Sequence, residues 1–203
     1  MIATGHLRNA LTLLISVPLV CQAAESQITS EQYLGAGVSR ISIQSGHPSI
    51  EDQSISGISV VYGIRRYNHV FEMTVGGGDG VNVGPTYDIY YPEDRADYSY
   101  FSLAYHYQFR SLVTSTDIVP YLGGGYSFNS INWQNYVYDH SGEGYALVAG
   151  VLLPVDNNWS FNVSFTRQSY SGSRILFSSS DYESYTTSVN LFTVNIVYHF
   201  LSL

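Results

Sequence analysis

The residues that could do chemistry in this chain are a few histidines, serines and carboxylates at close spacing. A histidine and a serine two residues apart, with an acid nearby to orient the imidazole, could hydrolyse an acyl ester. His47 and Ser49 have that spacing, but the intervening proline places the pair in a loop. His140, Ser141 and Glu143 supply the residue types at another spacing, also in a predicted loop. We therefore predict no catalytic residues and no enzymatic activity.

The other histidines are no better placed for catalysis or for metal binding. His106 and His199 lie in strand-like segments, but Gln108 and Leu201 occupy the positions two residues on. The six histidines are scattered, and no two stand at the spacing of metal ligands. The glycine-rich run 76–80 lacks the lysine and the helix of a phosphate-binding loop. The sequence therefore predicts neither a metal site nor a cofactor.

The strongest bias in the chain is in four segments that we predict as long loops. Eleven of the sixteen acids fall there, and only Arg95 and Arg174 offset them. Exposed tyrosines beside acids can form a contact surface, since tyrosine supplies rigid area and one polar tip. The candidate contact residues are Tyr87, Tyr90, Tyr91, Glu93, Asp94, Trp133, Tyr136, Tyr138 and Tyr182. The alternative is that these loops are inert and solvated.

The elements that must position these residues are β-strands, because the recurrent pattern is alternation. Odd positions of 101–109 are apolar, and even positions are small or polar. The same period of two recurs in 159–166 and 192–200. Such stripes are typical of strands with one apolar and one polar face. We count eight segments of this kind: 32–44, 55–66, 69–78, 98–109, 119–129, 144–153, 159–169 and 185–200.

The connections between these segments alternate between short and long. Short turns on one side, long loops on the other and an even strand number are typical of a bacterial outer-membrane barrel. A two-residue turn at Tyr67 and Asn68 would pair Ile64 with Phe71, Tyr62 with Met73 and Val60 with Val75, all on one apolar face. The fold class predicted is therefore all-β, an eight-stranded antiparallel up-and-down transmembrane β-barrel.

The predicted interior is polar and includes Arg65, Glu72, His106 and Gln108. Eight strands leave an interior just wide enough for side chains, which favours a hydrogen-bonded plug over a wide channel. Aromatic residues fall where interface belts would lie, with Tyr98 among those at the long-loop rim. Arg167 shares the outward parity and would either reach the level of lipopolysaccharide phosphates or merely extend its charged group to water.

The N-terminus has the layout of a secretory signal peptide. An apolar run at 10–20 is too short to span a bilayer, and small residues follow it. We predict a cleaved signal peptide at 1–24, with cleavage after Ala23 or Ala24, and a barrel at 25–203. Cys21, the single cysteine, could instead be lipidated, but the branched Val20 precedes it.

The composition supports the membrane and excludes nucleic acid as a partner. Charged residues make up 12% of the chain and aromatic residues 15%, with nineteen tyrosines. That low charge and high tyrosine content favour apolar side chains that face lipid. The formal net charge of −8 leaves nothing to neutralise a run of phosphates.

The chain resembles the small eight-stranded outer-membrane barrels, the OmpX/Ail-type and opacity-protein-like group. The likeness rests on residues 120–126 (PYLGGGY) and on the closing segment 194–200 (VNIVYHF). The resemblance implies that Tyr198 and Phe200 form the signal read by the barrel-assembly machinery. The tail 201–203 departs from the family pattern, since members usually stop at the aromatic residue.

What the resemblance implies about function is a structural or adhesion role at the cell surface. Its partners would be outer-membrane lipid and lipopolysaccharide, the assembly machinery and a host or other surface protein bound by the loops. Two alternatives stay open: a lipid A-modifying barrel enzyme, and a small pore. Related-looking palmitoyltransferases carry an amphipathic helix before the first strand, for which 25–31 is too short.

Overall fold

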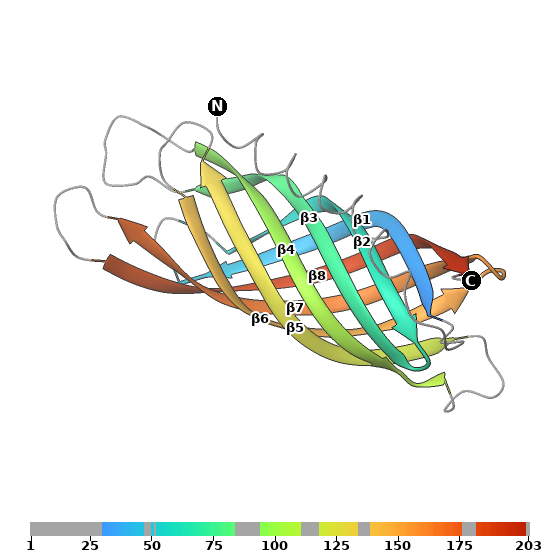
Figure 1. Ribbon diagram of the computed structural model, residues 1–203. Coiled ribbons are helices and arrows are strands. Elements are labelled where there is room, and N and C mark those ends of the chain that lie inside the picture. Colours follow the sequence, from blue (N-terminus) through green and yellow to red (C-terminus); the bar gives the residue numbers. More distant parts are fainter. Residues whose placement is uncertain are drawn as a thin grey trace.

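The computed structural model describes residues 30–46, 50, 52–83, 94–110, 118–133, 139–175 and 182–201. These residues form eight strands, which lie at a steep tilt around one axis (Figure 1). The strands are β1 (Glu31–Ser45), β2 (Gln53–Arg66), β3 (His69–Val83), β4 (Asp94–Gln108), β5 (Val119–Trp133), β6 (Asp139–Pro154), β7 (Trp159–Ile175) and β8 (Tyr182–Leu201). Among the described residues, no helix is long and apolar enough to cross a membrane. The predicted signal peptide and both cleavage sites lie outside the described residues.

The sheet closes on itself as an antiparallel barrel. Each strand pairs with its neighbours in sequence, and β1 pairs with β8 to close the ring. The predicted fold class is therefore confirmed. The predicted register of the first hairpin is also confirmed, since Ile64 pairs with Phe71 and Val60 with Val75. Tyr67 in the two-residue turn takes a φ of 57°, a conformation in which glycine would carry no strain.

We call the end that carries the β2–β3 and β6–β7 turns the short-turn end, and the other the long-loop end. The strand β8 finishes at the short-turn end, on the right of Figure 1. In the half of the barrel next to this end, most outward side chains are apolar on every strand. We call them the apolar belt. Its main members are Leu34, Ala36, Val38, Ile58, Val60, Ile64, Phe71, Met73, Val75, Phe101, Leu103, Tyr105, Leu122, Tyr126, Phe128, Tyr145, Leu147, Ala149, Phe161, Val163, Phe165, Phe192, Val194 and Ile196.

Inside the apolar belt, the barrel is filled mainly by polar side chains. Glu31, Arg65 and Glu72 share this space with a small apolar cluster that includes Tyr33 and Val61. The buried polar members are Ser39, Ser59, Ser102, His106, Gln108, Ser127, Ser160, Asn162, Ser164, Thr193, Asn195 and His199. Several are bonded to one another; Ser59 donates to Asn195 over 2.9 Å, for example.

In the half next to the long-loop end the polarity is reversed. The outward side chains there form what we call the polar collar. Its members are Arg40, Ser42, Gln44, Ser54, Ser56, Asp97, Ser99, Ser130, Asn132, Ser141, Glu143, Arg167, Ser169, Ser171, Thr186, Ser188 and Asn190. The interior at this level is mainly apolar. Its apolar part, the long-loop core, consists of Ile41, Ile43, Ile50, Val81, Ala96, Tyr98, Tyr100, Ile131, Tyr170, Val189 and Leu191, with the polar side chains of Asn129, His140, Gln168 and Thr187 buried beside it.

The reversal is visible within single strands. On β1, Val38 is outward and 65% exposed, whereas Ile41 is inward and fully buried. Tyr98 was expected at an outer aromatic rim, and that expectation is wrong. It lies in the long-loop core, where its hydroxyl donates to Asn129 over 2.6 Å, because its parity on β4 is that of the inward Ser102.

Large inward side chains fit into this narrow interior because glycines face them on the next strand. Gly63 stands opposite Tyr33 in the β1–β2 register, and a Cβ there would overlap the Tyr33 ring. Gly150 stands opposite Tyr121 in the same way on β5 and β6. The tyrosine rings therefore occupy room that the glycines leave free.

Candidate functional site

The structure describes only part of the candidate loop contacts, and the described ones lie at the long-loop end. Tyr87, Tyr90, Tyr91, Glu93, Tyr136 and Tyr138 lie outside the described residues. The other three are strand-end positions: Asp94 begins β4, Trp133 ends β5 and Tyr182 begins β8. In the β4–β5 register Trp133 pairs with Ala96, two residues from Asp94, so these two belong to one edge of the rim.

The four predicted interior residues all lie in the short-turn half, on the inner face. Arg65 and Glu72 share the polar face of the β2–β3 hairpin, but each bonds to β1 instead of to the other. Arg65 forms an ion pair with Glu31, and Glu72 accepts a hydrogen bond of 2.6 Å from the Tyr33 hydroxyl. His106 stacks on the Tyr121 ring at 4.4 Å between centroids.

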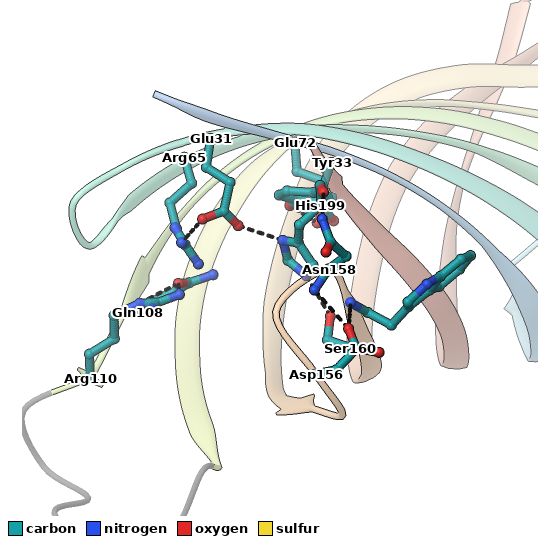
Figure 2. Close-up of polar contacts among 11 residues, drawn as sticks. Glu31, Tyr33, Arg65, Glu72, Gln108, Arg110, Asp156, Asn158, Ser160 and His199 are labelled. Atoms are coloured by element: carbon teal, nitrogen blue, oxygen red, sulfur yellow. Dashed lines mark hydrogen bonds and ion pairs between the residues drawn. The ribbon is translucent and has the colours of Figure 1, made fainter. Parts of the chain in front are cut away.

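These contacts join a larger set that the sequence did not predict, which we call the short-turn network. Its centre is Glu31, whose carboxylate lies between Arg65 and His199 (Figure 2). His199 Nδ1 lies 2.5 Å from Glu31 Oε1, and His199 Nε2 lies 2.7 Å from Ser160 Oγ. Beside it, Arg110 donates to the Gln108 side-chain oxygen over 3.0 and 3.1 Å. Four strands, β1, β2, β7 and β8, are thereby tied together at the short-turn end.

The β6–β7 turn fixes Ser160 and His199 in their places. Asp156 Oδ1 accepts hydrogen bonds from the backbone N–H groups of Asn158 and Trp159 over 2.7 and 2.8 Å. Asn158 in turn holds the backbone of His199: its carbonyl accepts from the His199 N–H over 2.7 Å, and its side-chain amide donates to the His199 carbonyl over 3.2 Å. The turn therefore clamps the end of β8.

Hydroxyl, imidazole and carboxylate stand here in the order found in serine hydrolases. The surroundings of Ser160 do not fit that chemistry. Its side chain is 2% exposed, and the adjoining cavity, of about 10 Å³, is lined by residues that do not include it. A cavity of this size has room for about one water molecule and none for an acyl substrate. Glu31 also forms an ion pair with Arg65, so we interpret the arrangement as a structural cross-link between the strands.

The sequence missed this network because its members are far apart along the chain and its central pair comes from the first and last strands. Glu31 and His199 are 168 residues apart and meet only when β1 pairs with β8. The signal available was parity: Ser160 and His199 lie on the polar faces of their strands, together with Asn162 and Asn195. No described group of three or more histidine, cysteine or acidic residues could hold a metal ion.

The two residues of the expected assembly signal face outward at the short-turn end. Phe200 is exposed, and the Tyr198 ring lies 4.9 Å from it between centroids. On the other side, Tyr198 contacts Trp159 edge to face at 4.8 Å. Leu201 is the last strand residue, so the aromatic pair belongs to the barrel wall and is accessible from outside.

The sequence and the fold were compared with known proteins. Residues 10–200 match the model of one family, the outer membrane protein beta-barrel domain. A comparison with curated protein sequences finds no match.

Several solved structures share the fold. Neisserial surface protein A is 15% identical, with a TM-score of 0.58 over 82% of this chain and 96% of its own. OprG of Pseudomonas aeruginosa is 12% identical, with a TM-score of 0.60 over 87% and 99%. Ail of Yersinia pestis, in complex with the heparin analogue sucrose octasulfate, is 14% identical, with a TM-score of 0.55 over 84% and 99%. At these identities the likeness shows the fold alone.

Proposed function

Since this chain belongs to the outer membrane protein β-barrel family, and is thus an outer-membrane barrel, we propose that it acts without catalysis as a surface protein. Its long-loop end holds an acidic, tyrosine-rich surface outside the cell, where it contacts a basic host or surface protein. The observation that carries this proposal is the reversal of polarity halfway along the barrel. Short turns face the periplasm in bacterial barrels, which places the reversed half outside.

A polar collar around an apolar core is the arrangement of a water-soluble protein. The strands therefore continue as a packed unit beyond the lipid, and the long-loop core fixes their ends. Eleven fully or nearly fully buried apolar residues make up this core, a contiguous cluster of the kind that marks a packed unit. A rigid platform of this kind supports contact residues at its rim with little loss of entropy on binding.

The charge of the loops favours one class of partner. The segments predicted as long loops, which the structure places partly in strand ends, carry eleven acids against two arginines, and this excess repels a polyanion and attracts a basic surface. Ail, by contrast, was crystallised with the heparin analogue sucrose octasulfate, a polyanion that an acidic surface would repel. The tyrosines among the acids would supply the contact area that charge alone lacks.

The filled interior argues against the two alternatives. A pore needs an aqueous path along the axis, whereas the long-loop core blocks that path with buried apolar side chains. A lipid A-modifying enzyme needs a nucleophile that a lipid can reach, and Ser160 is enclosed within the wall. Both arguments support a barrel that works through its outer surface.

The proposal is tested with whole bacteria that carry the full chain and are added to host epithelial cells. We expect attachment to fall about tenfold at low salt when Asp88→Asn, Glu93→Gln and Asp94→Asn remove three loop acids. The control variant, Asp156→Asn, removes an acid from the short-turn end, keeps a side-chain oxygen that can accept the turn's hydrogen bonds, and should attach like the parent. Soluble polylysine should compete, and soluble heparin should not.

Two results would overturn the proposal. One is attachment that does not change in the loop variant although the barrel is folded, as shown by heat-modifiable migration on gels. The other is stepwise conductance of the purified barrel in planar bilayers, which would favour a pore.

A further inference from the structure

Two arginines interrupt the otherwise uncharged side of the barrel just above the apolar belt. Arg40 on β1 and Arg167 on β7 are both exposed and outward. They occupy the first outward position beyond Val38 and Phe165, where the belt ends on their strands. The described charges of the collar on other strands are acids, Asp97 on β4 and Glu143 on β6. The collar is therefore basic on one side and acidic on the other.

The strand register places the two arginines on either side of β8. Arg40 pairs with Phe192, and Arg167 pairs with Asn190, the next outward position on β8. Neighbouring strands are about 4.8 Å apart, so the two Cα atoms are separated by about 12 Å. Both long side chains can thus reach a single group that covers β8 between them.

No described residue forms an ion pair with Arg40 or Arg167. Their outward neighbours are short donors instead: Ser42 on β1, Asn190 on β8 and Ser169 on β7. Guanidinium groups bind phosphate through two parallel hydrogen bonds, and hydroxyl and amide groups complete such a site. The chemistry displayed here is that of a phosphate receptor.

We propose that Arg40 and Arg167 bind the phosphate groups of a lipid in the outer leaflet, seated on β8. The position selects a lipid over a free phosphate, because the arginines lie directly above apolar belt residues of the same strands. The acyl chains of such a lipid would lie along Phe192, Val38 and Phe165, while its head group meets the arginines. The phosphorylated glycolipid of the outer leaflet has this chemistry.

The site is on the side wall and does not involve the loops. It therefore goes beyond the proposed function, and either can fail without the other. It would add an attractive contact with the surrounding lipid on one side only, which would orient the barrel relative to its lipid neighbours.

The experiment is native mass spectrometry of the full barrel in detergent, with diphosphorylated lipid A as the probe. We expect the parent to retain the lipid and Arg40→Gln with Arg167→Gln to retain at least about tenfold less. Arg66→Gln, which removes an exposed arginine at the short-turn end, is the matched control and should behave like the parent. Arg40→Lys with Arg167→Lys should fall between them, since lysine keeps the charge without the paired hydrogen bonds.

The probe also separates a lipid from a free anion. Lipid A without its phosphates should be retained as weakly by the parent as the intact lipid is by the double variant. Inorganic phosphate at millimolar concentration should not displace the intact lipid. Equal retention by the parent and a folded double variant would overturn the proposal, as would displacement by inorganic phosphate or an equal loss in Arg66→Gln.

Discussion

The two halves of this barrel carry their apolar side chains on opposite faces of the same sheet. In the short-turn half, apolar side chains face outward and a bonded polar network fills the interior. In the long-loop half, the outward face is polar and the interior is the apolar long-loop core. The strands pair as antiparallel neighbours in both halves, apart from a register shift between Gly78 and Val81 on β3, so the halves differ in the direction of their apolar side chains and not in topology. The comparison teaches that one sheet serves both as a membrane anchor and as a water-soluble support.

The largest effect is expected from a cavity in the long-loop core. Ile41→Ala should destabilise the barrel by about 2–5 kcal/mol, because Ile41 is fully buried and its neighbours cannot close the space. Val38→Ala on the same strand should lower the free energy of unfolding much less, since mobile lipid fills the space that the smaller side chain leaves outside. Urea unfolding in lipid vesicles measures both. Equal costs would mean that Ile41 does not belong to a packed core.

A charge placed on the outer wall tests where the apolar belt ends and the polar collar begins. Ile196→Arg, in the middle of the apolar belt, should cost about 2–4 kcal/mol, because it puts a guanidinium at the centre of the lipid layer. Ser188→Arg, on the same face of β8 but in the polar collar, should cost about 0–1 kcal/mol. The same unfolding assay compares the two variants. A similar cost at both positions would remove the boundary that we place between Phe192 and Asn190.

The short-turn network should contribute through its charges, unlike the polar collar. Glu31→Gln should destabilise by about 1–3 kcal/mol, because Arg65 is left partly buried without its carboxylate. Glu143→Gln, which removes an exposed outward acid, should change stability by less than about 0.5 kcal/mol. A double-mutant cycle with Arg65→Gln should show coupling of about 0.5–3 kcal/mol. Additive effects of Glu31→Gln and Arg65→Gln would contradict the network.

The smallest effect concerns the serine next to His199. Ser160→Ala should cost about 1 kcal/mol, the contribution of one hydrogen bond. A fluorophosphonate reagent, which labels activated serines, should not react with the folded parent. Labelling of the parent that disappears in Ser160→Ala would show that Ser160 is an activated nucleophile and would contradict a purely structural role for it.

The strands and the first hairpin register could be predicted because alternation over eight segments leaves few other folds. The reversal of polarity could not be predicted by assuming one parity for each strand. Its signal is nevertheless present as an odd spacing between outward and inward apolar residues. Tyr100 and Phe101 are adjacent yet face opposite ways, and the outward Phe128 lies three residues before the inward Ile131. The prediction of an outer position for Tyr98 is wrong because it does not take this spacing into account.

The candidate site was less accessible to prediction than the fold. The inward direction of Arg65, Glu72, His106 and Gln108 follows from alternation alone. Their partners do not follow from alternation, because those depend on the register between strands: Glu31 stands opposite Arg65 across β1 and β2, and Tyr121 on β5 lies beside His106. Glu31 lies one residue before the segment predicted as the first strand, so the centre of the short-turn network was excluded at the start. A polar residue on an inner face finds its partner through shear between strands, which sequence periodicity does not specify.

The reversal of polarity also fixes the position of the barrel along the membrane normal. A vertical displacement by two residues, about 5 Å for a tilted strand, would pull Arg40, Arg167 and Asn190 into hydrocarbon. A displacement the other way would lift Val38, Phe165 and Phe192 into water. The apolar belt has members on all eight strands and the polar collar on seven, so either movement carries a cost on most strands at once and the energy well along the membrane normal is narrow. The long-loop ends of the strands consequently stand at a defined height above the lipid.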